Sequence, residues 1–176
     1  IIDGQQRLTT TAMLLASIRD HLKADGAAPI VVESIENEFL SIIDRVRGER
    51  VPRLTLNVDD NDFFRDLVNR PDNPKLSPSR ESHRLLMAAR DTARARVRKI
   101  VGQVNPQHRI DVLNDWLAFL EESASVILVK APNGAQAYRM FETLNDRGLK
   151  TSQVDLVKSY LFGQADRRLA EAQAKW

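Results

Sequence analysis

The chain has 176 residues, of which 43% are hydrophobic, and its formal net charge is +2. This length accommodates one ordinary domain or two small ones, and the composition suffices to bury a core. Because the sequence contains no cysteine, disulfides, thiolate nucleophiles and cysteine-ligated zinc are excluded. No run approaches the roughly 18 apolar residues of a membrane span, and no secretory signal is recognisable, so a cytoplasmic protein is predicted.

The first expected elements are a strand end, a tight turn and a helix. Ile1 and Ile2 resemble the end of a buried strand, and Asp3-Gly4 suits the turn because glycine tolerates a positive φ. Apolar residues then recur at three- and four-residue spacing over residues 8–22, which predicts an amphipathic helix. Gly26, followed by a proline, ends that pattern.

A β-hairpin is expected in the next part of the chain. Residues 31–40 suit a helix, whereas residues 39–46 and 53–58 resemble two strands that are joined near Gly48. Residues 59–68 then predict a short helix with an apolar face.

The second half of the chain is predicted to be mainly helical. Three prolines among polar residues predict a loop over residues 70–79, and a long helix with an apolar face follows over residues 86–104. Pro106 begins another helix. The β-branched content of residues 126–129 favours a strand.

Two more helices are expected near the end of the sequence, one over residues 137–144 and one opened by Ser152 with a capping box. The predicted fold class is α+β, mainly helical, with a small sheet. Residues 1–69 and 80–176 are expected to form the two parts of one continuous domain that belongs to a longer protein.

Polar residues gather where the first strand passes into the first helix. A helix N-terminus offers unpaired N–H groups and the positive end of the helix dipole, so anions bind there readily. Gly4 would let a phosphate approach the backbone, and Arg7 would hold that phosphate. Gln5 and Gln6 could orient water, and Asp3 could hold a metal or polarise a water. The same residues also suit a structural turn with Asp3 as the helix N-cap.

Two blocks of the sequence resemble one protein family. Asp3-Gly4-Gln5-Gln6-Arg7-Leu8-Thr9-Thr10 is similar to the signature of the DGQQR family, the N-terminal domain of GmrSD-type modification-dependent restriction endonucleases. The segment from Phe141 to Leu149, followed by Asp155 to Lys158, resembles the family's other recurring element. The stretch from Arg53 to Asn57, leading to Asp60 and Phe63, is also similar.

The resemblance implies a ParB/sulfiredoxin-like fold with a nucleotide-binding turn, and the hydrolysis of a nucleoside triphosphate, with Mg²⁺, coupled to the cleavage of modified DNA. The expected partners are modified DNA and an HNH-type nuclease domain or subunit outside this sequence. The implied catalytic residues are Asp3, Gln5, Gln6 and Arg7. The implied nucleotide-binding residues are Gly4, Thr9, Thr10, Asn145 and Arg147.

Several features have structural alternatives. Asn145 to Gly148 also suit a helix C-cap. If they instead bind the nucleotide, the guanidinium groups of Arg147 and Arg7 should lie within about 15 Å of each other, which is about the length of one nucleotide. The three histidines have no metal-ligand spacing and are expected to be exposed helix residues. The basic series over residues 84–99 spreads around the polar side of its helix, which favours a solvated face over DNA contact.

Two classes of function therefore remain open. The first is an enzyme module that hydrolyses a nucleoside triphosphate and thereby licenses a nuclease. The alternative is a non-catalytic regulatory module that binds a nucleotide or modified DNA. Apart from Asp3, which could hold a metal, no metal-ligating residues are expected.

Overall fold

The computed structural model describes residues 4–46, 48–69 and 77–127, together with residues 130, 132 and 136. The chain divides into two compact units, one formed by Ile1–Gly4 with Ser125–Trp176 and the other by Gln5–Ala124. Nearly all of the described residues belong to the second unit, whose fold positions the first turn of the predicted nucleotide site.

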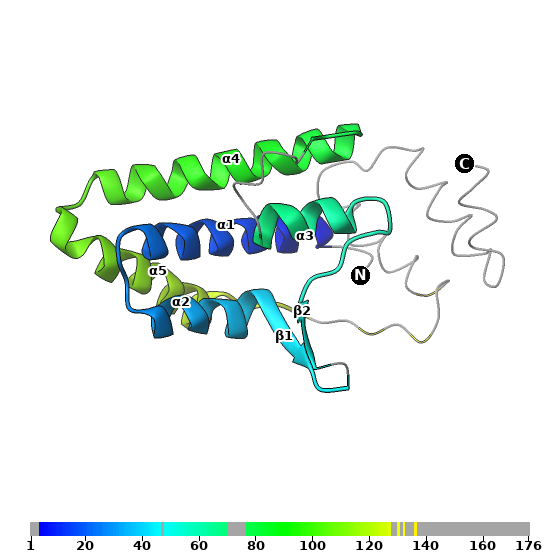
Figure 1. Ribbon diagram of the computed structural model, residues 1–176, viewed down its shortest axis with the longest axis horizontal. Coiled ribbons are helices and arrows are strands. Elements are labelled where there is room, and N and C mark those ends of the chain that lie inside the picture. Colours follow the sequence, from blue (N-terminus) through cyan, green and yellow to red (C-terminus); the bar gives the residue numbers. More distant parts are fainter. Residues whose placement is uncertain are drawn as a thin grey trace. The chain divides into compact units, whose positions relative to one another are not determined.

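The described part of this unit is a helical bundle with a small hairpin (Figure 1). Its helices are α1 (Gln5–Ala24), α2 (Pro29–Ile35), α3 (Asn61–Asn69), α4 (Glu81–Gly102) and α5 (Arg109–Ser123). A short π-helix, η1 (Glu36–Leu40), continues α2, and a 3-10 turn, η2 (Pro106–His108), precedes α5. The strands β1 (Ser41–Asp44) and β2 (Glu49–Pro52) form one antiparallel sheet. The prediction of a mainly helical fold with a small sheet is confirmed.

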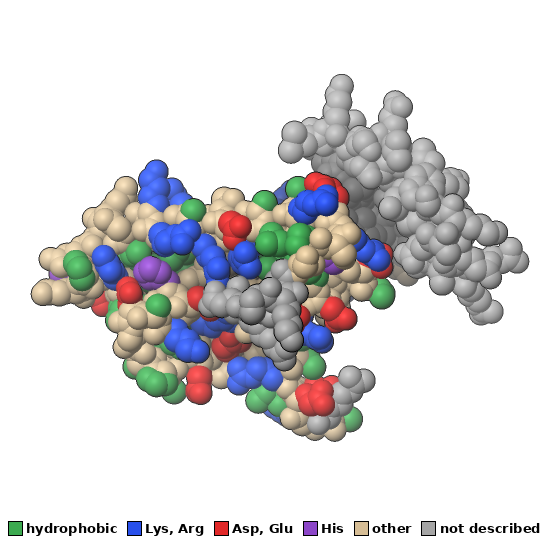
Figure 2. All heavy atoms as spheres, turned by 45° about the horizontal axis from the view of Figure 1, so that its top comes forward, with side chains coloured by type: hydrophobic (Ala, Val, Ile, Leu, Met, Phe, Trp, Pro, Cys, Tyr) green, Lys and Arg blue, Asp and Glu red, His purple; other side chains and the backbone are tan. Residues whose placement is uncertain are grey.

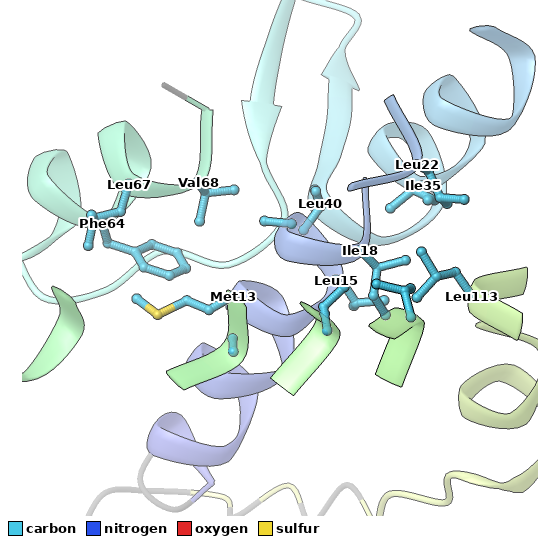
Figure 3. Close-up of a cluster of buried hydrophobic side chains, with 14 of the residues drawn as sticks. Met13, Leu15, Ile18, Leu22, Ile35, Leu40, Phe64, Leu67, Val68 and Leu113 are labelled. Carbon is cyan, nitrogen blue, oxygen red and sulfur yellow. The ribbon is translucent and has the colours of Figure 1, made fainter. Parts of the chain in front are cut away.

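Helix α1 is the centre of the core and packs against α2, α3, α4 and α5. Its apolar stripe is buried, as the spacing of residues 8–22 predicts, although Leu8 itself is partly exposed. Figure 3 shows how α3 and α5 contribute to the same cluster. The largest fully buried side chains of the core are Met13, Ile18, Leu22, Ile35, Val97 and Leu113.

The end of α1 follows from its glycine. Gly26 has a φ of +78°, a conformation that L side chains rarely adopt. The N–H of Ala27 donates to the carbonyl of Leu22 at 2.9 Å, which closes a Schellman motif. The predicted stop at Gly26 is therefore confirmed.

The hairpin is present, but its second strand lies earlier than predicted. Ser41 pairs with Pro52 and Asp44 pairs with Glu49, and the turn includes Gly48 with a φ of +68°. Residues 54–57, which were expected in the second strand, have no strand partner. Their alternating exposure arises because Leu54 and Leu56 pack on the core from an extended segment. Alternation therefore indicated an extended backbone, but a strand also requires hydrogen bonds to a neighbour.

The remaining predicted elements have different outcomes. The helices expected over residues 59–68 and 86–104 and from Pro106 are present as α3, α4 and η2 with α5. Val126 and Ile127 are exposed and lie in no strand, so the strand predicted there is not found in its described half. Residues 1–3, 70–76 and 137–176, where further strand, loop and helix predictions fall, lie outside the described residues.

A buried arginine of α1 connects this helix to η1 and to α3. Arg19 is 5% exposed, and its guanidinium forms an ion pair with Glu36 of η1 and another with Asp20. Its Nη2 also donates to the carbonyl of Val68 in α3 at 2.6 Å. The apolar spacing of α1 gave no sign of this contact, because both of the more distant partners are far away in the sequence.

Candidate functional site

The predicted phosphate-binding turn leads directly into α1. Gly4 has a φ of +83°, and a Cβ built at this position would meet no atom within 4 Å, so the backbone conformation is what favours glycine here. Gln5, Gln6 and Arg7 form the first turn of α1, and all three are exposed. Asp3, which was expected to act beside them, lies outside the described residues.

The electrostatics of this turn suit an anion. The first turn of α1 contains no acidic residue, so nothing within it opposes the positive end of the helix dipole. Within the described part of the chain, no hydrogen bond or ion pair involves the side chains of Gln6 or Arg7. Arg7 is therefore exposed and has no polar partner among the described residues that would give it a structural role.

The two threonines after Arg7 have a different local role. The Thr9 hydroxyl donates to the carbonyl of Gln5 and the Thr10 hydroxyl donates to the carbonyl of Gln6, each at 2.8 Å. Thr9 is buried, whereas Thr10 is exposed. Both hydroxyl protons are thus used inside α1, where they hold the carbonyls of the first turn.

The other predicted ligand-binding residues, Asn145 and Arg147, lie outside the described residues. The expected distance between the guanidinium groups of Arg7 and Arg147 therefore stays a prediction. The same holds for the helix C-cap that Asn145 to Gly148 would otherwise form.

A second polar cluster joins the start of α3 to the start of α4. Asp60 accepts hydrogen bonds from the Ser82 hydroxyl at 2.6 Å and from the Asn57 amide at 2.8 Å. His83 Nε2 lies 3.5 Å from the Asp60 carboxylate, and the His83 ring stacks on Phe63 with the ring centroids 4.0 Å apart. These contacts link the start of α3 to the start of α4.

The histidine of this cluster corrects a sequence prediction. His83 is 6% exposed, not an exposed helix residue as expected. The backbone N–H of Ser79 points at Nδ1 from 3.4 Å, so Nδ1 accepts and Nε2 carries the proton toward the carbonyl of Asp59, 3.2 Å away. His83, in the first turn of α4, therefore holds the N–H of Ser79, the residue before the N-cap Arg80. Only the similarity of the Asn57 to Phe63 stretch hinted at this cluster.

The neighbouring ion pair extends the cluster to the surface. Arg80 contacts Asp59 at 2.7 Å, and both side chains are more than half exposed. The hydrogen bond to Asp59 and the charge of that carboxylate raise the pKa of Arg80 above its ordinary value. Asp59 therefore favours the cationic form of Arg80, but the pair is exposed to solvent and stabilises the junction only weakly.

We expect His83→Ala to lower the free energy of unfolding by about 2–3 kcal/mol, because hydrogen bonds of about 1 kcal/mol each and the ring stacking are lost. Urea denaturation followed by circular dichroism measures this change. His108→Ala is the matched control, since the His108 side chain is 63% exposed, and its effect should stay within about 0.5 kcal/mol. Equal effects of the two substitutions would show that the cluster does not stabilise the fold.

The described residues include neither a metal site nor a membrane-spanning helix. No group of three or more His, Asp or Glu side chains among them is placed to hold a metal ion. Nor do the described helices include one that is long and apolar enough to cross a membrane.

Comparison with known families decides the relationship that the two sequence blocks suggested. The chain matches the family described as "GmrSD restriction endonuclease, N-terminal domain" over residues 1–162. The chain belongs to this family. The match includes the exposed first turn of α1 and the Asp60 to His83 cluster, so both are parts of a GmrSD N-terminal domain. No curated protein and no solved structure matches the chain.

Proposed function

We propose that this GmrSD N-terminal domain binds and hydrolyses a nucleoside triphosphate as part of a modification-dependent DNA restriction system in phage defence. The observation that carries the proposal is the start of α1. A glycine with a positive φ leads into a helix whose first turn exposes Gln5, Gln6 and Arg7 and contains no acidic residue. The helix dipole and the Arg7 guanidinium together favour a phosphate at this position.

The residues of the turn have complementary roles in this proposal. Gly4 brings the backbone close to the phosphates, and Arg7 donates to their oxygens as a planar fork. Gln5 and Gln6 orient the attacking water, and Asp3 polarises it or holds Mg²⁺, which would neutralise phosphate charge when bound. Thr9 and Thr10 support the turn through their bonds to the carbonyls of Gln5 and Gln6.

Family membership supports the wider proposal. Asn145 and Arg147 belong to the second block that resembles the family, and we propose that they complete the nucleotide site. The partners proposed with the nucleotide are modified DNA and an HNH-type nuclease domain or subunit. Hydrolysis of the nucleotide would allow this nuclease to cleave the DNA. The ParB/sulfiredoxin-like character of the turn is part of the same proposal.

Arg7→Ala should abolish nucleotide hydrolysis by the full chain and leave the fold intact. The loss of a charge-assisted contact to a phosphate corresponds to about 1.5–3 kcal/mol of binding free energy. The fold should be retained because the Arg7 side chain is exposed. Phosphate release from ATP and from GTP with Mg²⁺ measures the activity. Arg45→Ala is the matched control, because Arg45 is also exposed but lies in the hairpin turn.

Two outcomes would contradict this prediction. If Arg7→Ala unfolds the protein while Arg45→Ala does not, Arg7 is structural. If the wild-type chain binds the nucleotides but releases no phosphate, the alternative holds and the domain is a regulatory binding module.

A further inference from the structure

Charge is distributed unevenly along α4. The helix contains six basic residues but two acidic ones, Glu81 and Asp91, both before its midpoint. Residues 92–110 contain no Asp or Glu at all. The basic side chains of the second half of the helix are Arg94, Arg96, Arg98 and Lys99, which we name the basic segment of α4.

Ion pairing separates the two halves of the helix. In the first half, Arg84 contacts Glu81 at 2.6 Å and Arg90 contacts Asp91 at 2.9 Å. In the second half, Arg94 reaches Asp20 of α1 at 3.9 Å. Arg96, Arg98 and Lys99 are exposed, and within the described ranges none of them has an ion-pair or hydrogen-bond partner. The first half of α4 is thus neutralised, whereas Arg96, Arg98 and Lys99 are not neutralised by any described residue. This difference is the observation against the solvated face that the spread of the basic series favoured in the sequence.

The opposite side of the same segment anchors it rigidly. Ala93, Val97 and Val101 are buried in the core, so the basic side chains extend from a fixed backbone. Figure 2, in which the side of the molecule that bears α4 comes forward, shows Lys and Arg side chains gathered over this face. Because the backbone of this segment is already folded, a polyanion could bind to these side chains without first ordering the chain.

The helix dipole does not account for this distribution. Cations near a helix C-terminus are favourable, but the effect falls off within the last turn. Lys99 is in the last turn of α4, whereas Arg94 and Arg96 lie more than one turn before Gly102. If these charges served only to keep the protein soluble, acidic residues would be expected among the basic ones.

We propose that the basic segment of α4 binds the phosphate backbone of duplex DNA. Two of its three cations without a partner among the described residues are arginines, Arg96 and Arg98, whose planar forks can donate two parallel hydrogen bonds to a phosphate. Contacts of this kind hold DNA independently of its sequence, as a restriction system requires while a modified site is being sought. The proposal does not depend on nucleotide hydrolysis, because the segment lies outside the first turn of α1.

Fluorescence anisotropy of a labelled DNA duplex of mixed sequence, measured without nucleotide, tests this proposal. The full chain should bind the duplex with an affinity that falls steeply as KCl rises from about 50 to 200 mM. The double substitution Arg96→Gln/Arg98→Gln should weaken binding about ten-fold or more and reduce the log–log salt slope by about 2. Arg45→Gln/Arg50→Gln, which removes the same charge from the hairpin, should change either quantity far less.

Three results would overturn the proposal: no salt-dependent binding by the wild-type chain, equal weakening by the two double substitutions, or displacement of the duplex by polyglutamate at the same concentration of negative charge. The last result would indicate an acidic protein as the partner. Thermal unfolding of both variants confirms that the helix is retained. Loss of DNA binding with intact nucleotide hydrolysis would separate the failure of this site from a failure of the proposed hydrolase.

Discussion

Arg19→Ala is expected to lower the free energy of unfolding by about 3–5 kcal/mol, which is the cost of removing one partner of a buried ion pair. The guanidinium joins α1 to Glu36 of η1 and to the carbonyl of Val68 in α3. Without it, the partly buried Glu36 carboxylate loses its cation and the Val68 carbonyl loses a donor. An ion pair on the surface usually contributes less to the free energy of unfolding, because water can solvate both charges when the pair is broken.

Urea denaturation measures this loss, and Arg98→Ala is the control because Arg98 is exposed and has no partner among the described residues. The control should change the free energy of unfolding by no more than about 0.5 kcal/mol. The double substitution Arg19→Met/Glu36→Gln should recover part of the loss, since it also removes the charge of the Glu36 carboxylate that Arg19 pairs with. A loss below about 1 kcal/mol for Arg19→Ala would show that water reaches this ion pair.

The second large effect is expected for Phe64→Ala, at about 3–5 kcal/mol. Phe64 is 2% exposed and lies on α3, and Figure 3 shows Met13 of α1 extending beneath its ring. Truncation removes this buried aromatic surface and leaves a cavity between the two helices. Phe119 of α5 is 61% exposed, so Phe119→Ala is the matched control and should cost far less. Similar losses for the two substitutions would mean that α3 does not pack on α1 in solution.

The helices could be predicted from the sequence wherever their apolar residues repeat. The stripe of α1 and the face of α4 were visible at three- and four-residue spacing, and Gly26 ended α1 as glycine is expected to do. The second strand was misplaced because residues 53–58 alternate without a strand partner. Hydrogen-bond pairing between strands depends on the turn at Gly48, which alternation does not reveal.

Buried polar residues were the part that the sequence did not predict. Arg19 contacts residues 17 and 49 positions away, and His83 contacts Asp59 from 24 positions away. Periodicity within one helix identifies the side that is buried, but it does not identify the distant group that makes a buried cation or imidazole acceptable. His83 was therefore mistaken for an exposed residue.

The start of the candidate site could be predicted from its residue types. A glycine before a helix, followed by polar residues and an arginine, predicted a turn with a positive φ and exposed side chains, and Gly4 and residues 5–7 have these features. That this turn binds an anion stays a prediction. One turn does not identify a particular ligand, because the same N–H groups could donate to any phosphate. Nucleotide hydrolysis therefore enters through the family resemblance and stays a proposal.

Backbone amide shifts of the isotopically labelled full chain, titrated with non-hydrolysable ATP and GTP analogues and Mg²⁺, test the nucleotide site most directly. We expect the largest changes at the amides of Gly4 through Leu8 and at the Arg7 side-chain Nε, because these N–H groups would donate to the phosphates. The amides of the β1–β2 hairpin should not move. Unchanged amides at Gly4 through Leu8, or larger changes in the hairpin, would contradict the assignment of this turn as the phosphate site.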